Sequence, residues 1–311
     1  MIEEKQILEE KVSERPLEIE IQRQNIFEVN KLLKEHKDEL IVQRDMASAQ
    51  RDQIAEQRRE IMDSIHYAQR IQNAIMPGQT LMNEILSEYF VFFRPRNVVS
   101  GDYYWVTRLG NKTLAVAADC TGHGVPGSLM SMLGISLLNE MVLKREIETA
   151  SEILNELRTN IKFILSQTGA AGEQHDGMDM ALCIIDYQAM ELQYAGAYNP
   201  LYLIRSGVLM EYKADKMPVG IFLPDKEKDF TNQIIPLQHN DMLYIFSDGY
   251  IDQFGEENNE KFKSKPFKRL LTELSVLPVE RQKKILIETH DKWKGNGNQL
   301  DDILVFGIRI N

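Results

Sequence analysis

The chain has 311 residues, of which 43% are hydrophobic and 27% charged, as in an ordinary globular protein. Its formal net charge of -11 excludes nucleic acid as the main partner, because a phosphate backbone would repel the protein. Cys120 and Cys183 form neither a disulfide framework nor a metal motif, which favours a cytoplasmic protein. There is no signal-peptide pattern, and no apolar run approaches the roughly 20 residues that span a bilayer, so we expect no direct membrane insertion.

Residues 1–76 have the pattern of one long helix. They contain a single proline and no glycine, and they are rich in Glu, Gln, Arg, Lys and Leu, which favour helix. Small or apolar residues recur at every seventh position: Val12, Ile19, Ile26, Leu33, Leu40, Ala47, Ile54, Ile61, Ala68 and Ile75. This strict repeat predicts a left-handed coiled coil, and we expect it to form a parallel homodimer.

The second seam of this coiled coil is polar at its centre. It contains Val29, His36, Gln43, Gln50, Gln57, Ser64 and Ile71. Polar seam residues lower stability and help to fix register and oligomeric state. Two interpretations remain open: a plain dimerisation rod, or a coil that transmits a signal by changing between two packings.

The remaining residues, 77–311, have the pattern of a compact α+β domain that begins after Met76-Pro77-Gly78. Short apolar runs follow one another at hairpin distance, and helical patterns come in pairs, which indicates helices packed on antiparallel sheets. The predicted strands are Tyr89–Phe93, Tyr103–Arg108, Thr113–Ala118, Met180–Asp186, Leu192–Ala195, Leu201–Ile204, Met242–Phe246 and Ile303–Ile310. The predicted helices are Val125–Arg145, Ala150–Leu165, Lys265–Ser275 and Pro278–Trp293.

Acidic residues stand at the ends of several of these strands. Asp119 ends one apolar strand and Asp248 ends another, Asp301 and Asp302 immediately precede a third, and Asp102 immediately precedes a fourth. Each is expected where a buried strand reaches solvent. Any one of them taken alone is explained as a turn residue, because aspartate side chains bond to nearby backbone N–H groups.

A cluster of these acids would need cations. If the strand ends converge, the carboxylates cannot all stay ionised without positive charge nearby, and oxygen ligands favour Mg²⁺ or Mn²⁺. Zinc is disfavoured, because His123 is the only histidine near these acids in the sequence. The glycines of Asp119-Cys120-Thr121-Gly122-His123-Gly124 would let the backbone approach ions or a phosphate. A pair of hard cations suits phosphate-ester hydrolysis.

With these motifs the domain resembles the metal-dependent (PPM, type-2C) protein phosphatases, in the bacterial branch typified by the stage II sporulation E protein. The resemblance covers roughly residues 65–310. It rests on Ser100-Gly101-Asp102-Tyr103-Tyr104, the Asp119–Gly124 stretch, Ser247-Asp248-Gly249 and Asp301-Asp302, with Ala195–Pro200 and Met217–Gly220 in support. These motifs are specific when they occur together in this order, whereas each is weak alone.

The resemblance implies a sandwich of two antiparallel sheets flanked by helices, with two Mn²⁺ or Mg²⁺ ions and a bridging water that attacks phosphoserine or phosphothreonine. It implies that Asp119 contacts both ions. The other implied metal ligands are Asp102, Asp248, Asp301 and the main-chain carbonyl of Cys120, with Asp302 as an orienting neighbour.

Two further assignments stay open in this resemblance. His123 is either a general acid for the leaving group or a structural turn residue. Asp176 and Asp179 either help to hold a third ion or form a hairpin turn. Ser100, Trp105 and Leu304 depart from the common pattern of the branch, which has glycine, an acid and threonine there.

The resemblance also implies a role in signalling. In this bacterial branch the substrates are typically phosphoproteins that antagonise an anti-sigma factor. The helix that enters the domain acts as a switch in that branch, and here this helix would be Ser64–Met76. Two other functions compete with this interpretation. One is a catalytically weak dimeric scaffold that binds a phosphoprotein, and the other is a hydrolase of small phosphoesters.

Overall fold

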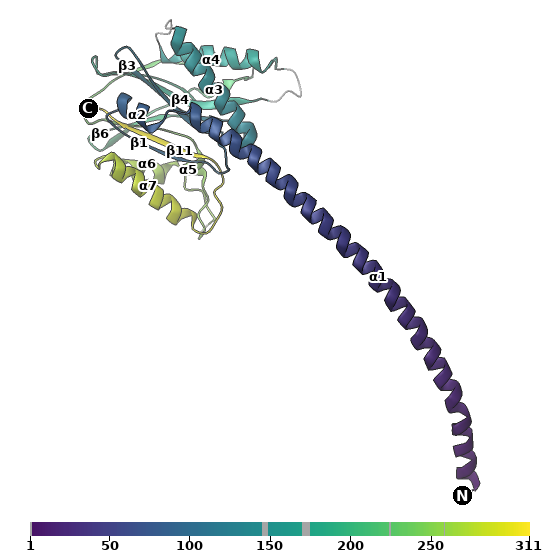
Figure 1. The fold of residues 1–311 in the computed structure, drawn as a ribbon. Helices are drawn as coiled ribbons and strands as arrows, with labels where there is room; N and C mark the ends of the chain where they lie inside the picture. The colour runs from purple at the N-terminus through teal and green to yellow at the C-terminus, as the bar shows by residue number, and fades with distance from the viewer. Residues whose placement is uncertain (1, 145–148, 170–174, 224, 258) are drawn as a thin grey trace. The chain divides into compact units, whose positions relative to one another are not determined.

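The computed structural model describes residues 2–144, 149–169, 175–223, 225–257 and 259–311. The chain divides into two compact units, Met1–Asp63 and Ser64–Asn311. Helix α1 (Ile2–Ile75) runs through the first unit, and its last turns belong to the second, which holds all the other described elements (Figure 1). The predicted long N-terminal helix is therefore confirmed, including its end before Met76-Pro77.

Two antiparallel sheets form the second unit. The order in the first sheet is β1 (Glu88–Arg94), β11 (Ile303–Arg309), β10 (Met242–Phe246), β6 (Leu201–Arg205) and β7 (Val208–Tyr212). The order in the second is β2 (Tyr103–Leu109), β3 (Lys112–Cys120), β4 (Gly177–Asp186), β5 (Glu191–Ala197) and β9 (Gln233–Pro236), with β8 (Val219–Gly220) paired to β4. All eight predicted strands are present, and the predicted α+β architecture is confirmed.

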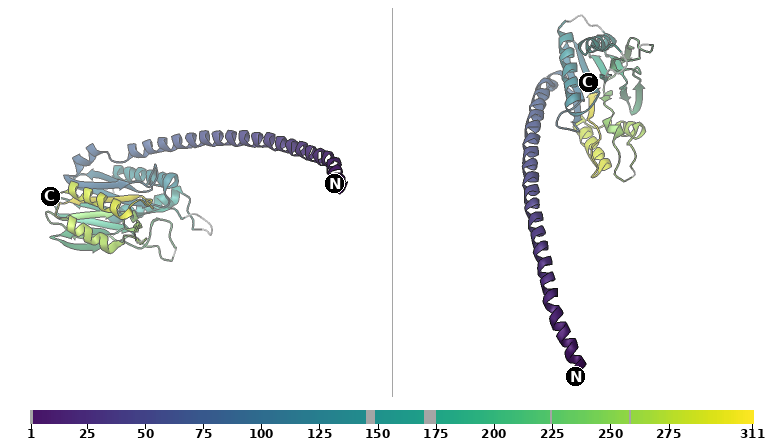
Figure 2. Two further views of the ribbon diagram at one scale, coloured as in Figure 1. Left: turned by 90° about the horizontal axis from the view of Figure 1, so that it is seen from below. Right: turned by 90° about the vertical axis from the view of Figure 1, so that its right-hand side faces the viewer.

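Helices cover the outer faces of both sheets, so that the unit has four layers (Figures 1 and 2). Helices α3 (Gly124–Lys144) and α4 (Ala150–Ile164) pack on the second sheet, and α6 (Ser264–Leu274) and α7 (Val279–Lys294) pack on the first. Three buried hydrophobic clusters fill the spaces between neighbouring layers. All four predicted long helices are present, with ends that differ by one residue at most; the end predicted at Arg145 lies outside the described residues.

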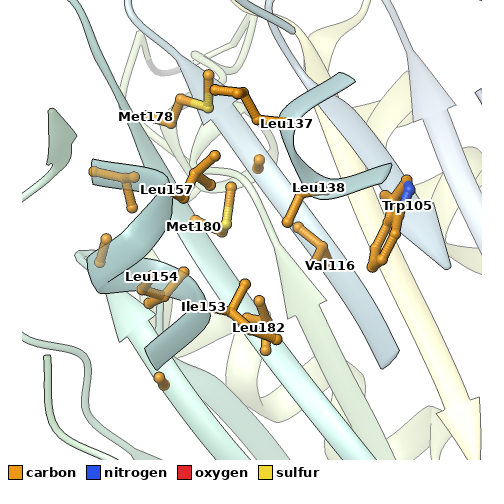
Figure 3. Close-up of a cluster of buried hydrophobic side chains, with 14 of the residues drawn as sticks. Trp105, Val116, Leu137, Leu138, Ile153, Leu154, Leu157, Met178, Met180 and Leu182 are labelled. Atoms are coloured by element: carbon orange, nitrogen blue, oxygen red, sulfur yellow. The ribbon is translucent and has the colours of Figure 1, made fainter. Parts of the chain in front are cut away.

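The central strands are buried on both faces. In β3, Leu114 and Val116 face α3 and α4, while Ala115 and Ala117 face the other sheet. Such a strand reads as a continuous apolar run rather than as an alternation. Figure 3 shows the outer cluster, in which Val116 and side chains of α3 and α4 point toward one another. The strand ends that carry the acids are thereby held on a rigid support.

Helix α4 begins and ends at identifiable signals. Thr149 and Glu152 form a reciprocal capping box at its N-terminus. The helical spacing of apolar residues from Ala150 to Leu165 predicts one buried stripe, and the structure buries Ala150, Ile153, Leu154, Leu157 and Ile161 of this stripe. The predicted stripe was wrong at its C-terminal end, where the helix stops and Ile164 and Leu165 are exposed.

The expectation that no apolar run approaches membrane-spanning length was wrong for helix α3. Among the described residues, its segment Gly124–Val142 is the one stretch long and apolar enough to span a membrane by length and composition. Half of this segment is buried inside the protein, as in a core helix that packs on a sheet. Its composition follows from its position against the second sheet and beside α4.

Several short elements were not predicted. They are α2 (Gln79–Ile85), α5 (Gly249–Asp252), β7, β8 and β9. The two helices span 7 and 4 residues, too few to show a helical period. The edge strand β9 ends in Pro236, which lowers its strand signal.

The core of the second unit gives a first prediction. Leu154 is fully buried against the second sheet, so Leu154→Ala should lower the free energy of unfolding by about 3 kcal/mol, through lost transfer energy and a residual cavity. Phe163 lies on the same helix but is 83% exposed. Phe163→Ala should therefore change the free energy of unfolding by less than about 0.5 kcal/mol. Urea unfolding measures both, and equal losses would contradict this assignment of the core.

Candidate active site

Strand pairing gathers acidic residues at one end of the sandwich. The β3–β4 register places Asp119 directly opposite Asp179. Asp248 follows β10 and Asp301 precedes β11, and these two strands are paired. Together with Cys120, Thr121, Gly122 and His123, these four aspartates line one hollow of about 360 Å³. The expected convergence of strand ends therefore holds for Asp119, Asp248 and Asp301.

The loop after β3 is fixed by backbone contacts. The Thr121 hydroxyl donates to the Gly177 carbonyl (3.2 Å) and accepts from the Gly177 N–H (3.1 Å), which ties this loop to the start of β4. Gly122 has a φ of +84°, in the left-handed region that favours glycine. A Cβ atom at Gly101 would lie 2.6 Å from the Gly122 carbonyl oxygen. Glycine is required at both positions, as their place in the motifs indicates.

Asp302 connects three segments beneath the hollow. Its side chain accepts from the backbone N–H groups of Arg96 (2.6 Å) and Gly101 (2.7 Å). Its own N–H donates to the Asp301 carboxylate (2.8 Å), which orients that side chain. A Cβ atom at Gly249 would collide with the Asp302 carbonyl oxygen. These contacts match the orienting position expected for Asp302.

Asp102 lies behind the hollow and does not line it. Its carboxylate accepts a 2.5 Å hydrogen bond from the Ser247 hydroxyl, which in turn accepts from the N–H of Leu304 (3.0 Å). The expectation that each acid lies where a strand reaches solvent was wrong for Asp102 and Asp302, which are 1% and 2% exposed. The loop before β2 folds inward and buries Asp102, and hydrogen bonds hold both carboxylates.

Mutual repulsion and burial disfavour ionisation of this cluster. Burial raises the pKa of Asp119 well above its ordinary value, and the charges of Asp102 and Asp248 raise it further. Burial likewise raises the pKa of Asp102 and Asp248, and it raises that of Asp179 to about 7. A bound cation would reverse these shifts.

The donor set fits hard divalent ions. Carboxylate oxygens and main-chain carbonyls are the ligands preferred by Mg²⁺ and Mn²⁺, and the hollow offers four carboxylates. Cys120 is buried, and hard divalent ions prefer oxygen to sulfur, so its thiol is no competing ligand. Within the described ranges, no three His, Cys, Asp or Glu side chains are already arranged as a complete ion site. The chemistry of the donors therefore suits these ions, while the side-chain positions by themselves define no site.

His123 and the Asp176–Asp179 pair also have definite places. His123 lines the hollow, is exposed, and its Nδ1 lies 3.2 Å from the Asn97 side-chain oxygen. Asp179 lines the hollow, whereas Asp176 does not. The Asp176 carbonyl instead accepts a hydrogen bond from the Gln167 side chain (2.7 Å). Of these two acids only Asp179 is positioned to meet an ion in the hollow.

Sequence reasoning missed a buried contact from the end of α1. Gln72 is 2% exposed, and its side chain donates to the Ser100 carbonyl (2.7 Å) and accepts from the Ser100 N–H (3.1 Å). It also donates to the Ser131 hydroxyl in α3 (2.8 Å). The buried Ser100 hydroxyl has no hydrogen-bond partner in the described structure. A polar residue among Ala68, Ile71 and Ile75 was the one sequence signal of this contact.

Two departures from the common motif lie away from the hollow. Trp105 is buried beneath α3, where its indole N–H donates to the Asn139 side chain (2.9 Å). Leu304 is buried between the two sheets. Neither residue lines the hollow, so these substitutions alter packing behind it rather than its rim.

Comparisons with known proteins agree with this geometry. A family model described as Stage II sporulation protein E (SpoIIE) matches residues 110–311, a range that begins after Asp102. The structure is similar to the PP2C domain of SiaA from Pseudomonas aeruginosa, with 30% identity and a TM-score of 0.73, over 82% of this chain and 98% of that one. No curated protein sequence gave a match.

Two more distant structures show the fold alone. The PP2C domain of SpoIIE from Bacillus subtilis, solved with a fragment of its regulatory domain, is 21% identical (TM-score 0.57; 72% of this chain, 61% of that one). The RsbU and RsbW domains of Rv1364c from Mycobacterium tuberculosis are 19% identical (TM-score 0.57; 71% and 59%). The sandwich and its carboxylate-lined hollow thus define a phosphatase domain of the PP2C type, a metal-dependent class. More narrowly, the chain belongs to the SpoIIE family.

The raised pKa of Asp179 gives a prediction about the metal-free protein. Because this pKa is about 7 in the folded state and about 3.9 in an unfolded chain, the folded state binds more protons between these values. The free energy of unfolding should therefore fall as pH rises from about 4 to 7 and level off above. In the presence of chelator, the free energy of unfolding of wild type should fall between pH 5 and pH 7.5. The fall should be smaller in Asp179→Asn, by at least about 1 kcal/mol.

Urea unfolding at several pH values measures this difference. Asp186→Asn, at the other end of β4, is the matched control and should follow wild type. If the free energy of unfolding has the same pH dependence in wild type, Asp179→Asn and Asp186→Asn, Asp179 does not cause the fall.

Proposed function

We propose that this protein is a metal-dependent protein serine/threonine phosphatase. The observation that carries the proposal is the convergence of Asp119, Asp179, Asp248 and Asp301 on one hollow, in a chain of the SpoIIE family. Burial and mutual repulsion raise the pKa values of all four, so a structure that keeps them together is explained by cations that neutralise them.

The residues in and around the hollow would bind the ions, orient the ligands and donate a proton. Asp119 would contact both of two Mn²⁺ or Mg²⁺ ions, with Asp248, Asp301, the Cys120 carbonyl and, after a side-chain movement, Asp102 as further ligands. When bound, such ions hold phosphoryl oxygens and lower the pKa of a water so that hydroxide attacks phosphorus. Asp302 would keep Asp301 oriented, and Asp179 would face a third ion. His123, exposed at the rim, would give a proton to the leaving serine oxygen.

Several features support a protein as substrate. The hollow is bordered by the exposed residues Thr121–His123, so a phosphoserine on another protein could approach it. One structural neighbour carries RsbU and RsbW domains together, and the description of another names the bacterial stressosome. We infer a cytoplasmic signalling role, with a phosphoprotein that antagonises an anti-sigma factor as the substrate.

Metal-dependent turnover tests the proposal. Wild type should hydrolyse an aryl phosphate and a phosphoserine peptide with Mn²⁺ or Mg²⁺ and lose this activity in chelator. Asp119→Asn and Asp248→Asn should lower kcat at least about a hundredfold, because each removes a charge that holds the ions. Asp186→Asn, which makes the same change at the far end of β4, should keep full activity.

The outcomes separate the competing functions. Retained activity in both site variants would refute the assignment. No turnover by wild type with any metal would favour the phosphoprotein-binding scaffold. Turnover of the aryl phosphate but of no phosphoprotein would favour a hydrolase of small phosphoesters.

We infer that the coiled coil makes a homodimer and regulates the hollow. Its seam residues are exposed along the helix: Val12, Ile19, Ile26, Leu33, Leu40, Ile54 and Ile61 are each at least 51% exposed. A second copy would cover them. The same helix reaches Gln72, which holds the backbone of Ser100 two residues before Asp102. A change in coil packing would then move the Asp102 loop and alter metal binding.

Gln72 gives the test of this regulation. Gln72→Leu removes the bonds to Ser100, so about a tenfold higher Mn²⁺ concentration should be needed for half-maximal activity. Asn73→Leu also replaces a side-chain amide by leucine, but at an exposed neighbouring position, and should leave the Mn²⁺ requirement unchanged. A proline inserted near Gln57 should separate the coil from the domain. Unaltered metal dependence in Gln72→Leu, with unaltered regulation after the insertion, would refute the switch.

A further inference from the structure

A groove of about 610 Å³ follows the outer edge of β1. Six consecutive residues of this strand, Tyr89–Arg94, line it. One wall comes from the start of α2, with Gln79 and Met82, and the other from α7, with Lys283 and Ile287. The six strand residues span roughly 20 Å, which is the length of an ordinary β-strand.

The lining of this groove shows that it reaches the strand backbone. Neighbouring side chains of β1 point to opposite faces: Phe90 and Phe92 enter the cluster under α6 and α7, while Tyr89 and Val91 face the other sheet. A cavity on one face would touch every second residue, whereas this one touches all six. In the described part of the chain, β1 pairs only with β11, so its outer N–H and C=O groups face the groove without a strand partner.

The sequence of β1 makes an open edge unusual. Exposed edges are commonly protected by proline, bulges or inward charges. The segment Glu88–Arg94 has neither proline nor glycine, and its five central residues are aromatic or valine, a composition with high strand propensity. Walls from α2 and α7 flank the strand edge on both sides, so the groove is a long, narrow site along one strand rather than an open sheet edge. The occupant that fits is therefore a single extended peptide segment.

The Arg94 end of the groove lies at the same end of the sandwich as the carboxylate hollow. The Gln299 side-chain amide donates to the carbonyl oxygens of both Arg94 and Asp301, at 2.8 Å each. Two residues after Arg94, the N–H of Arg96 bonds to Asp302. A peptide that leaves the groove past Arg94 therefore arrives beside Asp301, which lines the hollow.

We propose that the β1 groove binds an extended segment of the phosphoprotein substrate, next to the phosphorylated residue, by strand addition to β1. The proposal rests on the phosphatase function proposed above. Main-chain hydrogen bonds to the β1 edge would supply affinity, and alternate apolar side chains of the segment would contact the half-buried Ile287 in the wall from α7. The preferred substrates are thus phosphoproteins with an apolar extended segment beside the phosphoserine.

Synthetic phosphopeptides test this selectivity. The probes are peptides in which eight alternating valine and threonine residues precede or follow a phosphoserine, and matched peptides with a central proline. Proline removes a donor and disfavours pairing, so the better extended peptide should have about a tenfold higher kcat/KM than its proline match. The gain should lie in KM, because docking adds binding rather than chemistry.

Groove variants give the matched control. Ile287→Trp fills the groove and should abolish the preference for the extended peptide, whereas Glu288→Trp, on an exposed neighbouring position outside the lining, should retain it. Hydrolysis of an aryl phosphate should be equal in both variants and in wild type, because neither residue touches the hollow. Equal kcat/KM values for the extended and proline peptides would overturn the docking proposal.

Amide hydrogen exchange tests peptide docking in the β1 groove independently of the phosphatase function. Adding the unphosphorylated valine–threonine peptide should slow the exchange of alternate N–H groups within Tyr89–Arg94, and Ile287→Trp should remove this protection. The measurement needs no catalysis, so absent turnover with peptide-induced protection would overturn the phosphatase function alone. Unchanged exchange in β1 at saturating peptide, in a protein that hydrolyses aryl phosphate, would overturn the docking site alone.

Discussion

The fixed register of antiparallel strands holds like charges together, and the rest of the site depends on this constraint. The backbone of Asp119 cannot move away from that of Asp179 without breaking the β3–β4 ladder. Asp248 follows β10 and Asp301 precedes β11, so the pairing of these two strands brings both acids to the same end of the sandwich. The folded chain therefore keeps carboxylates at separations that free side chains would avoid, which raises their pKa values. Strain of this kind is typical of sites whose charge is completed by a ligand.

Hydrogen bonds behind the hollow connect its acids to distant segments. Asp302 links the loop after β1 with the loop before β2, Ser247 links Asp102 with β11, and Gln72 links the Ser100 backbone with α1. Each bond joins a segment beside the hollow to a separate structural element. Under the regulation proposed above, a displacement of α1 would act on the backbone of Ser100 through the two bonds from Gln72, and so on the loop that carries Asp102.

The two edges of β1 combine structural and functional roles. Its paired edge holds β11, which carries Asp301 to the hollow, while its free edge forms the floor of a groove that ends beside the same residue. Membership of the SpoIIE family accounts for the hollow and the sandwich. In the docking proposal, recognition of a substrate depends on surfaces such as this groove, where strand addition would supply affinity.

The sequence by itself determined the long helix, the eight main strands, the four main helices and the acids at strand ends, because periodicity and composition are local properties. It also assigned Asp119, Asp248 and Asp301 to one place through motif resemblance. The tertiary structure decided that Asp102 and Asp302 are buried, that Gln72 reaches the Ser100 loop, and that the edge of β1 stays open. These facts depend on contacts between residues far apart in the chain, and such contacts leave no periodic pattern in either partner's sequence.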